Sequence, residues 1–210
     1  PPMTSRRTTG ERTVVIGGGI SGLATAALLA RGGRDVVMLE KNDELGGRAS
    51  LLERDGFRFD LGPSWYLMPE VFDHFFRLMG TSSAEQLDLV QLDPGYRVYS
   101  EGHTEPLDIA ATREENVALF ERIEPGSGSR LERYLDSARE VYELAKKRFL
   151  YTTFESLTPL MTRDVVTELP RFAKLFGTDL DSAAGAVVSD TRLRQVLGYP
   201  AVFLGGSPFD

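Results

Sequence analysis

The sequence contains no cysteine and only two histidines, His74 and His103. The lack of cysteine excludes disulfides, thiolate metal sites and a cysteine nucleophile, and it is typical of a reducing compartment. Two histidines disfavour a multi-histidine metal site or a histidine-based triad. We predict that His74 is a polar helix residue and that His103 is a solvated turn residue. Neither is expected to be catalytic, and no metal site is predicted.

Positive charge is also in short supply. The 210 residues carry a formal net charge of -7, with 41% hydrophobic and 26% charged residues. Non-specific nucleic-acid binding needs a clustered basic surface, so nucleic acid is not expected as a partner. The composition is that of an ordinary soluble globular protein, long enough for one large domain or two small ones.

An uncharged run of seventeen residues, 14–30 (VVIGGGISGLATAALLA), raises the question of a membrane span or an export signal. A spanning helix needs about 20 mostly apolar residues, and a signal needs a compact apolar stretch with a small-residue cleavage site. Here Gly17, Gly18, Gly19 and Gly22 interrupt the run. It is therefore not expected to span a membrane or to direct export, and residues 1–12 are predicted to be a disordered leader.

The segments around these glycines predict a strand, a helix and a second strand. Residues 13–16 are β-branched and apolar, as a strand buried on both faces should be. Residues 21–31 are rich in Ala and Leu and end at two glycines, which predicts a helix. Residues 35–39 predict the second strand. The three form a βαβ unit, whose crossover should be right-handed.

The turn before the predicted helix has the spacing G-x-G-x-x-G. Gly17 allows the tight turn, Gly19 lets the backbone approach a diphosphate, and Gly22 lets the helix pack closely on the strand. The N-terminus of the helix, at Ile20 and Ser21, offers N–H groups and a positive dipole to that diphosphate. The spacing predicts a dinucleotide-binding turn, with a glycine-rich turn that binds no ligand as the alternative.

Glu40 ends the second predicted strand, eighteen residues after Gly22. An acid at this place can accept hydrogen bonds from both hydroxyls of a ribose. Its charge repels a 2′-phosphate, so NADP is disfavoured as the cofactor.

A second glycine turn, Gly46-Gly47-Arg48, follows six residues after Glu40. Two glycines permit a close backbone approach, and a guanidinium can bind a diphosphate bidentately. The alternative is a surface turn with a solvated arginine. Taken alone, this turn is more typical of the surface turn, although a plain NAD-binding fold would continue into another helix here.

Residues 14–50, which carry both turns, resemble the N-terminal signature of the FAD-dependent amine oxidase and phytoene desaturase superfamily. The resemblance implies that the first turn and the acid hold the ADP half of FAD, while the second turn holds the pyrophosphate and ribitol side. It also implies that the segment after a hairpin turning at Asp55-Gly56 returns to the flavin ring. The candidate cofactor-binding residues are Gly17, Gly19, Ile20, Ser21, Gly22, Glu40, Lys41, Gly46, Gly47, Arg48, Gly62, Pro63 and Ser64. No catalytic acid or base can be singled out.

Three later segments, 59–80, 92–99 and 196–210, most resemble bacterial-type carotenoid desaturases, the phytoene desaturases above all. Such enzymes are more than twice this length, and their C-terminal part closes over the flavin and completes the substrate tunnel. The resemblance therefore implies an N-terminal fragment with an α/β fold. A Rossmann-like FAD-binding βαβ unit would be followed by an inserted α+β substrate domain, incomplete at the C-terminus.

We predict that residues 13–66 form the N-terminal part of the FAD-binding domain and residues 67–210 the first part of the substrate and membrane-docking domain. The second part is expected to be mostly helical, with a hairpin near 96–109 formed by strands at 96–100 and 104–109. Its predicted helices begin at Pro69 or cover 113–123, 131–149 and 164–176, the last broken at Pro170, with a loop at 124–129.

Basic and aromatic residues lie together at 146–151 (KKRFLY). Such a cluster at the end of an amphipathic helix suits a membrane interface. The alternative is that Lys and Arg stand favourably at a helix C-terminus over an ordinary core-facing helix.

The function that the resemblance implies is FAD-dependent desaturation of a linear isoprenoid, phytoene or a related carotenoid precursor. Hydride would pass from carbon to flavin, in an oxidoreductase of carotenoid biosynthesis that is cytoplasmic and peripherally bound to the membrane. The electron acceptor is not identified. The alternatives are a carotenoid isomerase, another flavin oxidase of the amine-oxidase type, and a non-catalytic prenyl-binding chaperone of the same fold.

Overall fold

The structure is a computed structural model that describes residues 12–63, 65–156 and 161–208. The chain divides into two compact units, the first ending at Val90 and the second beginning at Gln91. Residues 1–11 of the predicted leader lie outside the described residues. Arg12, which was assigned to the leader, instead begins the first strand, because it pairs with Asp35 in the backbone register and through a 2.9 Å ion pair.

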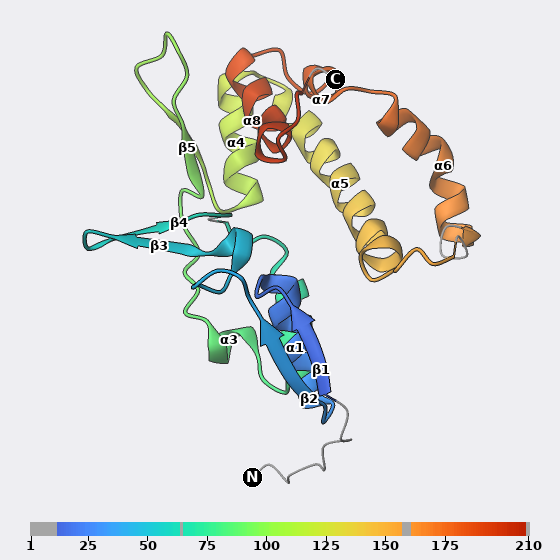
Figure 1. The fold of residues 1–210 in the computed structure, drawn as a ribbon. Coiled ribbons are helices and arrows are strands. Elements are labelled where there is room, and N and C mark those ends of the chain that lie inside the picture. The colour runs from blue at the N-terminus through green and yellow to red at the C-terminus, as the bar shows by residue number, and fades with distance from the viewer. Residues whose placement is uncertain (1–11, 64, 157–160, 209–210) are drawn as a thin grey trace. The chain divides into compact units, whose positions relative to one another are not determined.

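The first unit opens with the predicted βαβ arrangement. Strands β1 (Arg12–Ile16) and β2 (Asp35–Leu39) pair in parallel, and helix α1 (Ile20–Arg31) packs against them (Figure 1). The Rossmann-like prediction is confirmed. Helix α1 ends in a Schellman motif: Gly33 adopts a φ of +88°, its N–H donates to Ala30, and the N–H of Arg34 donates to Leu29.

The remainder of the first unit is a short turn, a hairpin and two helices. These are η1 (Gly47–Ala49), β3 (Leu51–Arg54), β4 (Phe57–Asp60), α2 (Pro69–Met79) and α3 (Ser83–Gln86). Asp55 and Gly56 have φ values of +54° and +82°, which a two-residue hairpin turn requires, so the predicted turn is confirmed. Residues 67–90 group with this first unit, although the sequence analysis assigned them to the second domain. The domain boundary at residue 66 stays a prediction about function.

The second unit is mostly helical. Its elements are β5 (Tyr96–Val98), β6 (Leu107–Ile109), α4 (Arg113–Ile123), α5 (Ser127–Ala145), the π-helical η2 (Lys146–Leu150), α6 (Arg163–Phe176), α7 (Leu180–Gly185) and α8 (Thr191–Phe203). The hairpin and α4 are found where they were predicted. The two strands are shorter than expected, with three paired residues each.

Two helix predictions were wrong in detail. Helix α5 begins at Ser127 rather than Leu131, because Glu121 accepts hydrogen bonds from the backbone N–H groups of Gly126 and Gly128 and so satisfies donors at the helix start. Helix α6 is not broken at Pro170. Proline removes one backbone hydrogen bond, and the remaining bonds on either side carry the helix through.

The hydrophobic core of the second unit joins β6, α4, α5, α7 and α8. It consists of Leu107, Phe120, Leu131, Ala184, Val187, Val188, Leu193, Val196 and Leu197. Glu124 links the segments around this core. Its carboxylate accepts hydrogen bonds from the backbone N–H groups of Ser189 (2.7 Å) and Asp190 (2.9 Å) and from the side chain of Arg130 (2.6 Å). Among the described residues, no helix has both the length and the apolar character needed to cross a membrane.

Candidate functional site

The first glycine turn connects the end of β1 to the start of α1. Gly17 has a φ of +100°, and its N–H donates to the carbonyl of Leu39 at the end of β2 (2.7 Å). A Cβ added to Gly22 would lie 1.9 Å from the carbonyl oxygen of Gly17. Both glycines are therefore required by the backbone path, as the sequence analysis predicted.

The N-terminus of α1 is open to an anion. Gly19 is the N-cap residue, and within the described structure the first turn of α1 has neither a side-chain cap nor an acidic residue. Ile20 and Ser21 are exposed there. An uncapped helix start with glycine at the N-cap leaves backbone N–H groups and the positive end of the dipole available, so these residues fit a diphosphate.

Glu40 is held in place by three donors. The backbone N–H of Gly18 donates to Oε2 (2.6 Å), while the backbone N–H and the side-chain Nδ2 of Asn42 donate to Oε1 (2.9 and 3.0 Å). Hydrogen bonds from two backbone N–H groups lower the pKa of Glu40 below its usual value. The bond from Asn42 has the larger effect, and the bond from Gly18 has the next largest. An ionised carboxylate offers about four acceptor positions, so about one is left for a ligand hydroxyl.

Gly18 also binds the second glycine turn. Its carbonyl accepts a hydrogen bond from the N–H of Gly46 (2.8 Å), and a Cβ on Gly47 would lie 3.2 Å from the Cα of Gly19. Gly46 and Gly47 have φ values of +110° and +60°, which a bulkier residue would adopt only with strain. The two turns thus form one structure, the glycine cradle, made of Gly17, Gly18, Gly19, Gly22, Gly46 and Gly47.

The segment after the hairpin lies against the second glycine turn, and its predicted approach to a flavin ring stays a prediction. Leu61 donates its N–H to the carbonyl of Ser50 (3.0 Å), and a Cβ on Gly62 would lie 2.0 Å from the carbonyl oxygen of Arg48. The side chains of Lys41, Arg48 and Pro63 are exposed, and Ser64 lies outside the described residues.

Sequence reasoning missed two residues of this site. Gly18 occupies an "x" position of the motif, yet it is the residue that links Glu40 to the second turn. The third consecutive glycine was the available signal. Asn42 could have been suspected because an amide two residues after an acid can turn back onto it.

A parallel strand–helix–strand unit with a glycine cradle and an acid at the end of β2 defines a Rossmann-like dinucleotide-binding unit. A family model described as "NAD(P)-binding Rossmann-like domain" matches residues 15–81. Cradle and match together support a dinucleotide as the cofactor.

Similarity to individual proteins extends over nearly the whole chain. A carotenoid 3,4-desaturase of Haloarcula japonica is 44% identical over 199 residues, which are 95% of this chain and 40% of that protein. A zeta-carotene-forming phytoene desaturase of Myxococcus xanthus is 36% identical over 98% of this chain and 39% of its own length. A phytoene desaturase of Cercospora nicotianae is 36% identical over 100% of this chain and 33% of its own length.

The chain is a homologue of the carotenoid and phytoene desaturases. It spans between about a third and two fifths of the length of these relatives.

Proposed function

We propose that this chain is part of an FAD-dependent desaturase that acts on a linear isoprenoid such as phytoene. The observation that carries the proposal is the pair of hydrogen bonds made by Gly18, one from its N–H to Glu40 and one to its carbonyl from Gly46. Through them the acid is joined to both glycine turns. The names of the homologues support the substrate class.

The second turn is what favours FAD over a nicotinamide cofactor. The open N-terminus of α1 would hold the diphosphate, and Glu40 would accept a ribose hydroxyl. Gly46, Gly47 and Arg48 would hold the diphosphate from the other side and continue toward the ribitol. The carboxylate of Glu40 disfavours NADP, because a 2′-phosphate beside it would be repelled.

When bound, FAD would supply the acceptor for a hydride removed from carbon, and a proton would leave the neighbouring carbon as the double bond forms. Gly62 and Pro63 would pass near the ring, because Gly62 lies so close to the second turn that an added Cβ would be 2.0 Å from the carbonyl oxygen of Arg48. The protein's part in this chemistry is to bind and orient the cofactor and to keep water from it.

An apolar substrate of this kind is stored in a bilayer, so we also propose peripheral binding of the protein to the cytoplasmic membrane surface. The segment after α5 supports this proposal: η2 carries Lys146, Lys147 and Arg148, its last residue Leu150 is 43% exposed, and the following Tyr151 is 58% exposed. Basic residues beside exposed apolar ones suit an anionic lipid surface.

The test is an anaerobic absorption spectrum of the complete natural chain containing this sequence, reconstituted with FAD and mixed with phytoene-loaded liposomes. Loss of the visible flavin band together with growth of conjugated-polyene absorption is the expected result. A yellow protein that binds the liposomes without either change would contradict phytoene desaturation and favour a carotenoid isomerase or another flavin oxidase. A colourless protein that binds prenyl chains would favour the chaperone.

A further inference from the structure

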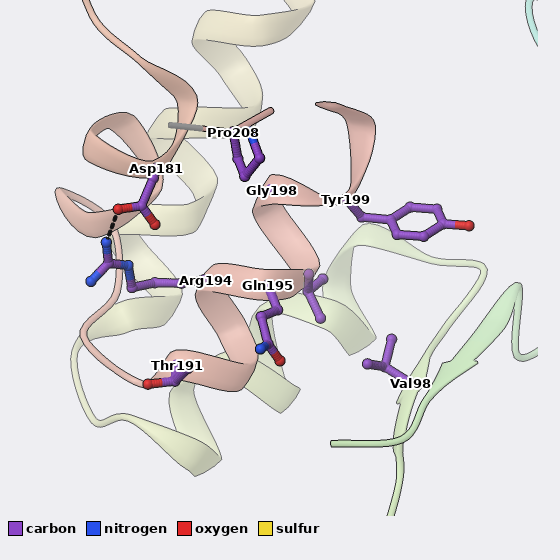
Figure 2. A pocket seen from close by; sticks show the side chains of 9 residues that line it. Val98, Asp181, Thr191, Arg194, Gln195, Gly198, Tyr199 and Pro208 are labelled. Carbon is purple, nitrogen blue, oxygen red and sulfur yellow. Dashed lines mark hydrogen bonds and ion pairs between the residues drawn. The ribbon is translucent and has the colours of Figure 1, made fainter. Parts of the chain in front are cut away.

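The second unit contains a cavity of about 470 Å³ between strand β5 and helix α8 (Figure 2). We infer that this cavity binds one end of the linear isoprenoid substrate. The inference rests on the proposed function and adds to it a place on the chain where the hydrocarbon is held. Small-molecule sites usually measure about 300–1,000 Å³, so the cavity can receive a small molecule or one end of a long one.

The walls of the cavity are fixed before any ligand arrives. Val196, one of its lining residues, is only 8% exposed and belongs to the hydrophobic core. At one end, the backbone N–H of Asp181 donates to the carbonyl of Pro208 (2.8 Å), which ties the segment after α8 to α7. Arg194 on α8 forms an ion pair with Asp181, drawn as a dashed line in Figure 2. A preformed cavity saves the ligand the cost of ordering its site.

The chemistry of the lining selects a neutral, mostly hydrocarbon ligand. Val98 from β5, with Val196, Tyr199 and Pro208, supplies apolar surface. The ring of Tyr199 stacks on that of Tyr96, with 5.6 Å between centroids, which makes it a firm aromatic wall.

The polar groups of the lining carry no net charge. Arg194 and Asp181 neutralise each other, and Thr191 and Gln195 are uncharged. A phosphate or carboxylate would therefore find no uncompensated cation here. A saturated or unsaturated chain end fits, with room for one uncharged polar group near Thr191 and Gln195.

Gly198 gives the strongest support for a ligand-binding role of this cavity. It lies in the interior of α8, where glycine is the least favourable residue after proline. Neither backbone nor packing demands it: its φ is not positive, and a Cβ would meet only the Cβ of Pro208 at 3.8 Å. By contrast, a Cβ at Gly22 or Gly62 would collide with backbone. What the missing side chain of Gly198 provides is cavity volume.

The experiment fills the cavity from Gly198 in two steps, Gly198→Ala and Gly198→Leu, in the complete natural chain with FAD bound. The control is Ala138→Leu, which adds the same kind of side chain to an exposed position of α5. Phytoene bound from liposomes, KM, kcat, flavin content and thermal midpoint are measured for each. We expect Gly198→Leu to raise KM about tenfold or more and to reduce bound phytoene similarly, with Gly198→Ala intermediate. Flavin content and the control should not change.

The outcomes separate the two levels of the proposal. If the unsubstituted protein reduces its flavin with phytoene and Gly198→Leu keeps the same KM and phytoene binding, the cavity is not the binding place and the inference is wrong. Failure of the unsubstituted protein to reduce its flavin overturns the proposed function and the cavity's role with it. If Gly198→Leu lowers the thermal midpoint, the graded effect of Gly198→Ala on KM decides the question, because its Cβ meets no clash.

Discussion

Asn42 donates two hydrogen bonds to the same carboxylate oxygen of Glu40, one from its backbone N–H at 2.9 Å and one from Nδ2 at 3.0 Å. The bond from the backbone N–H favours the ionised acid and is the largest cause of the lowered pKa of Glu40. The two bonds also fix the direction in which the remaining acceptor position of the carboxylate points. Asn42 is therefore a positioning residue for the acid that we assign to the ribose.

Replacing Asn42 by aspartate keeps the size of the side chain but turns a donor into a second carboxylate. We expect Asn42→Asp to weaken FAD binding at least about tenfold at about pH 8, since a charge-assisted hydrogen bond is lost and a like charge is added. The repulsion raises the pKa of one of the two carboxyl groups, so the deficit should shrink as the pH falls toward about 5. Flavin fluorescence titrations at both pH values measure the affinity of each protein for FAD.

Asn42→Ala serves as the companion variant, because it removes the side-chain bond without adding charge. Its loss of affinity should be smaller and should not vary with pH in this way. Equal affinity of the aspartate variant and the unsubstituted protein at the higher pH would show that Asn42 does not position Glu40.

Gly22→Ala should collapse the site as well as destabilise the first unit. The new Cβ would lie 1.9 Å from the carbonyl oxygen of Gly17, so the first turn must open. We expect a loss of about 2–3 kcal/mol in the free energy of unfolding, as for overpacked interiors, together with loss of bound flavin. Urea denaturation and the flavin absorbance of the purified protein test both.

Gly56→Ala is the matched control for that substitution. Gly56 has a φ of +82° and open space around its Cα, so the change costs about 1 kcal/mol of backbone strain without a clash. Flavin content should stay the same. Loss of flavin in this control as well would indicate that general instability, rather than the geometry of the first turn, removes the cofactor.

Glu124→Gln should destabilise the second unit and change its response to acid. The carboxylate accepts from two backbone N–H groups and from Arg130, and an amide cannot satisfy all three donors, so we expect a loss of about 2 kcal/mol. Hydrogen bonds from Asp190 and then Ser189 lower the pKa of Glu124 below its usual 4.5.

The sign of the pH effect follows from that lowered pKa. The stabilisation is present above pH 4.5 and is lost as the pH falls through the lower folded-state pKa. The glutamine variant should therefore lose less stability than the unsubstituted protein between about pH 5 and pH 2. The control is Glu132→Gln, which removes the same charge at an exposed position. It should lose as much stability between about pH 5 and pH 2 as the unsubstituted protein does. If the free energy of unfolding falls equally with pH for Glu124→Gln and for the unsubstituted protein, Glu124 is not the source of this pH dependence.

Leu150→Glu tests the proposed membrane surface. A charge on the last residue of η2 should reduce binding to vesicles of phosphatidylcholine and phosphatidylglycerol several-fold, because an apolar contact is lost and anionic headgroups repel the new carboxylate. Leu92→Glu makes the same exchange at another exposed leucine, 63% exposed, and should bind as before. Co-sedimentation at low salt measures the bound fraction, and an equal decrease in both variants would argue against η2 as the docking segment.

The βαβ unit was predicted to within one residue because its signals are local. A β-branched run, an Ala- and Leu-rich helix and its terminal glycines each act over a few neighbours. Helix α8 gave no such signal, since Gly198 and Pro200 both disfavour a helix. It forms because burial of Leu193, Val196 and Leu197 outweighs those preferences, a tertiary effect that no short window records.

The candidate site shows the same division. Gly17, Gly22 and Glu40 could be assigned from spacing alone, since the motif describes a local backbone path. The bond from Gly18 to Glu40 joins residues 22 positions apart, and the bond from Gly46 to Gly18 depends on how the second turn packs. Contacts of that kind depend on how distant segments of the chain pack together, and a local sequence motif carries no information about that packing.

The glycine cradle also has a consequence for the order of events during synthesis. All the contacts that build it lie between Gly17 and Gly47. Contacts over short sequence separations form early, and N-terminal segments leave the ribosome first. The cradle can therefore take shape, and meet its nucleotide, while the second unit is still being translated. Cofactor supply would then influence how the rest of the nascent chain folds.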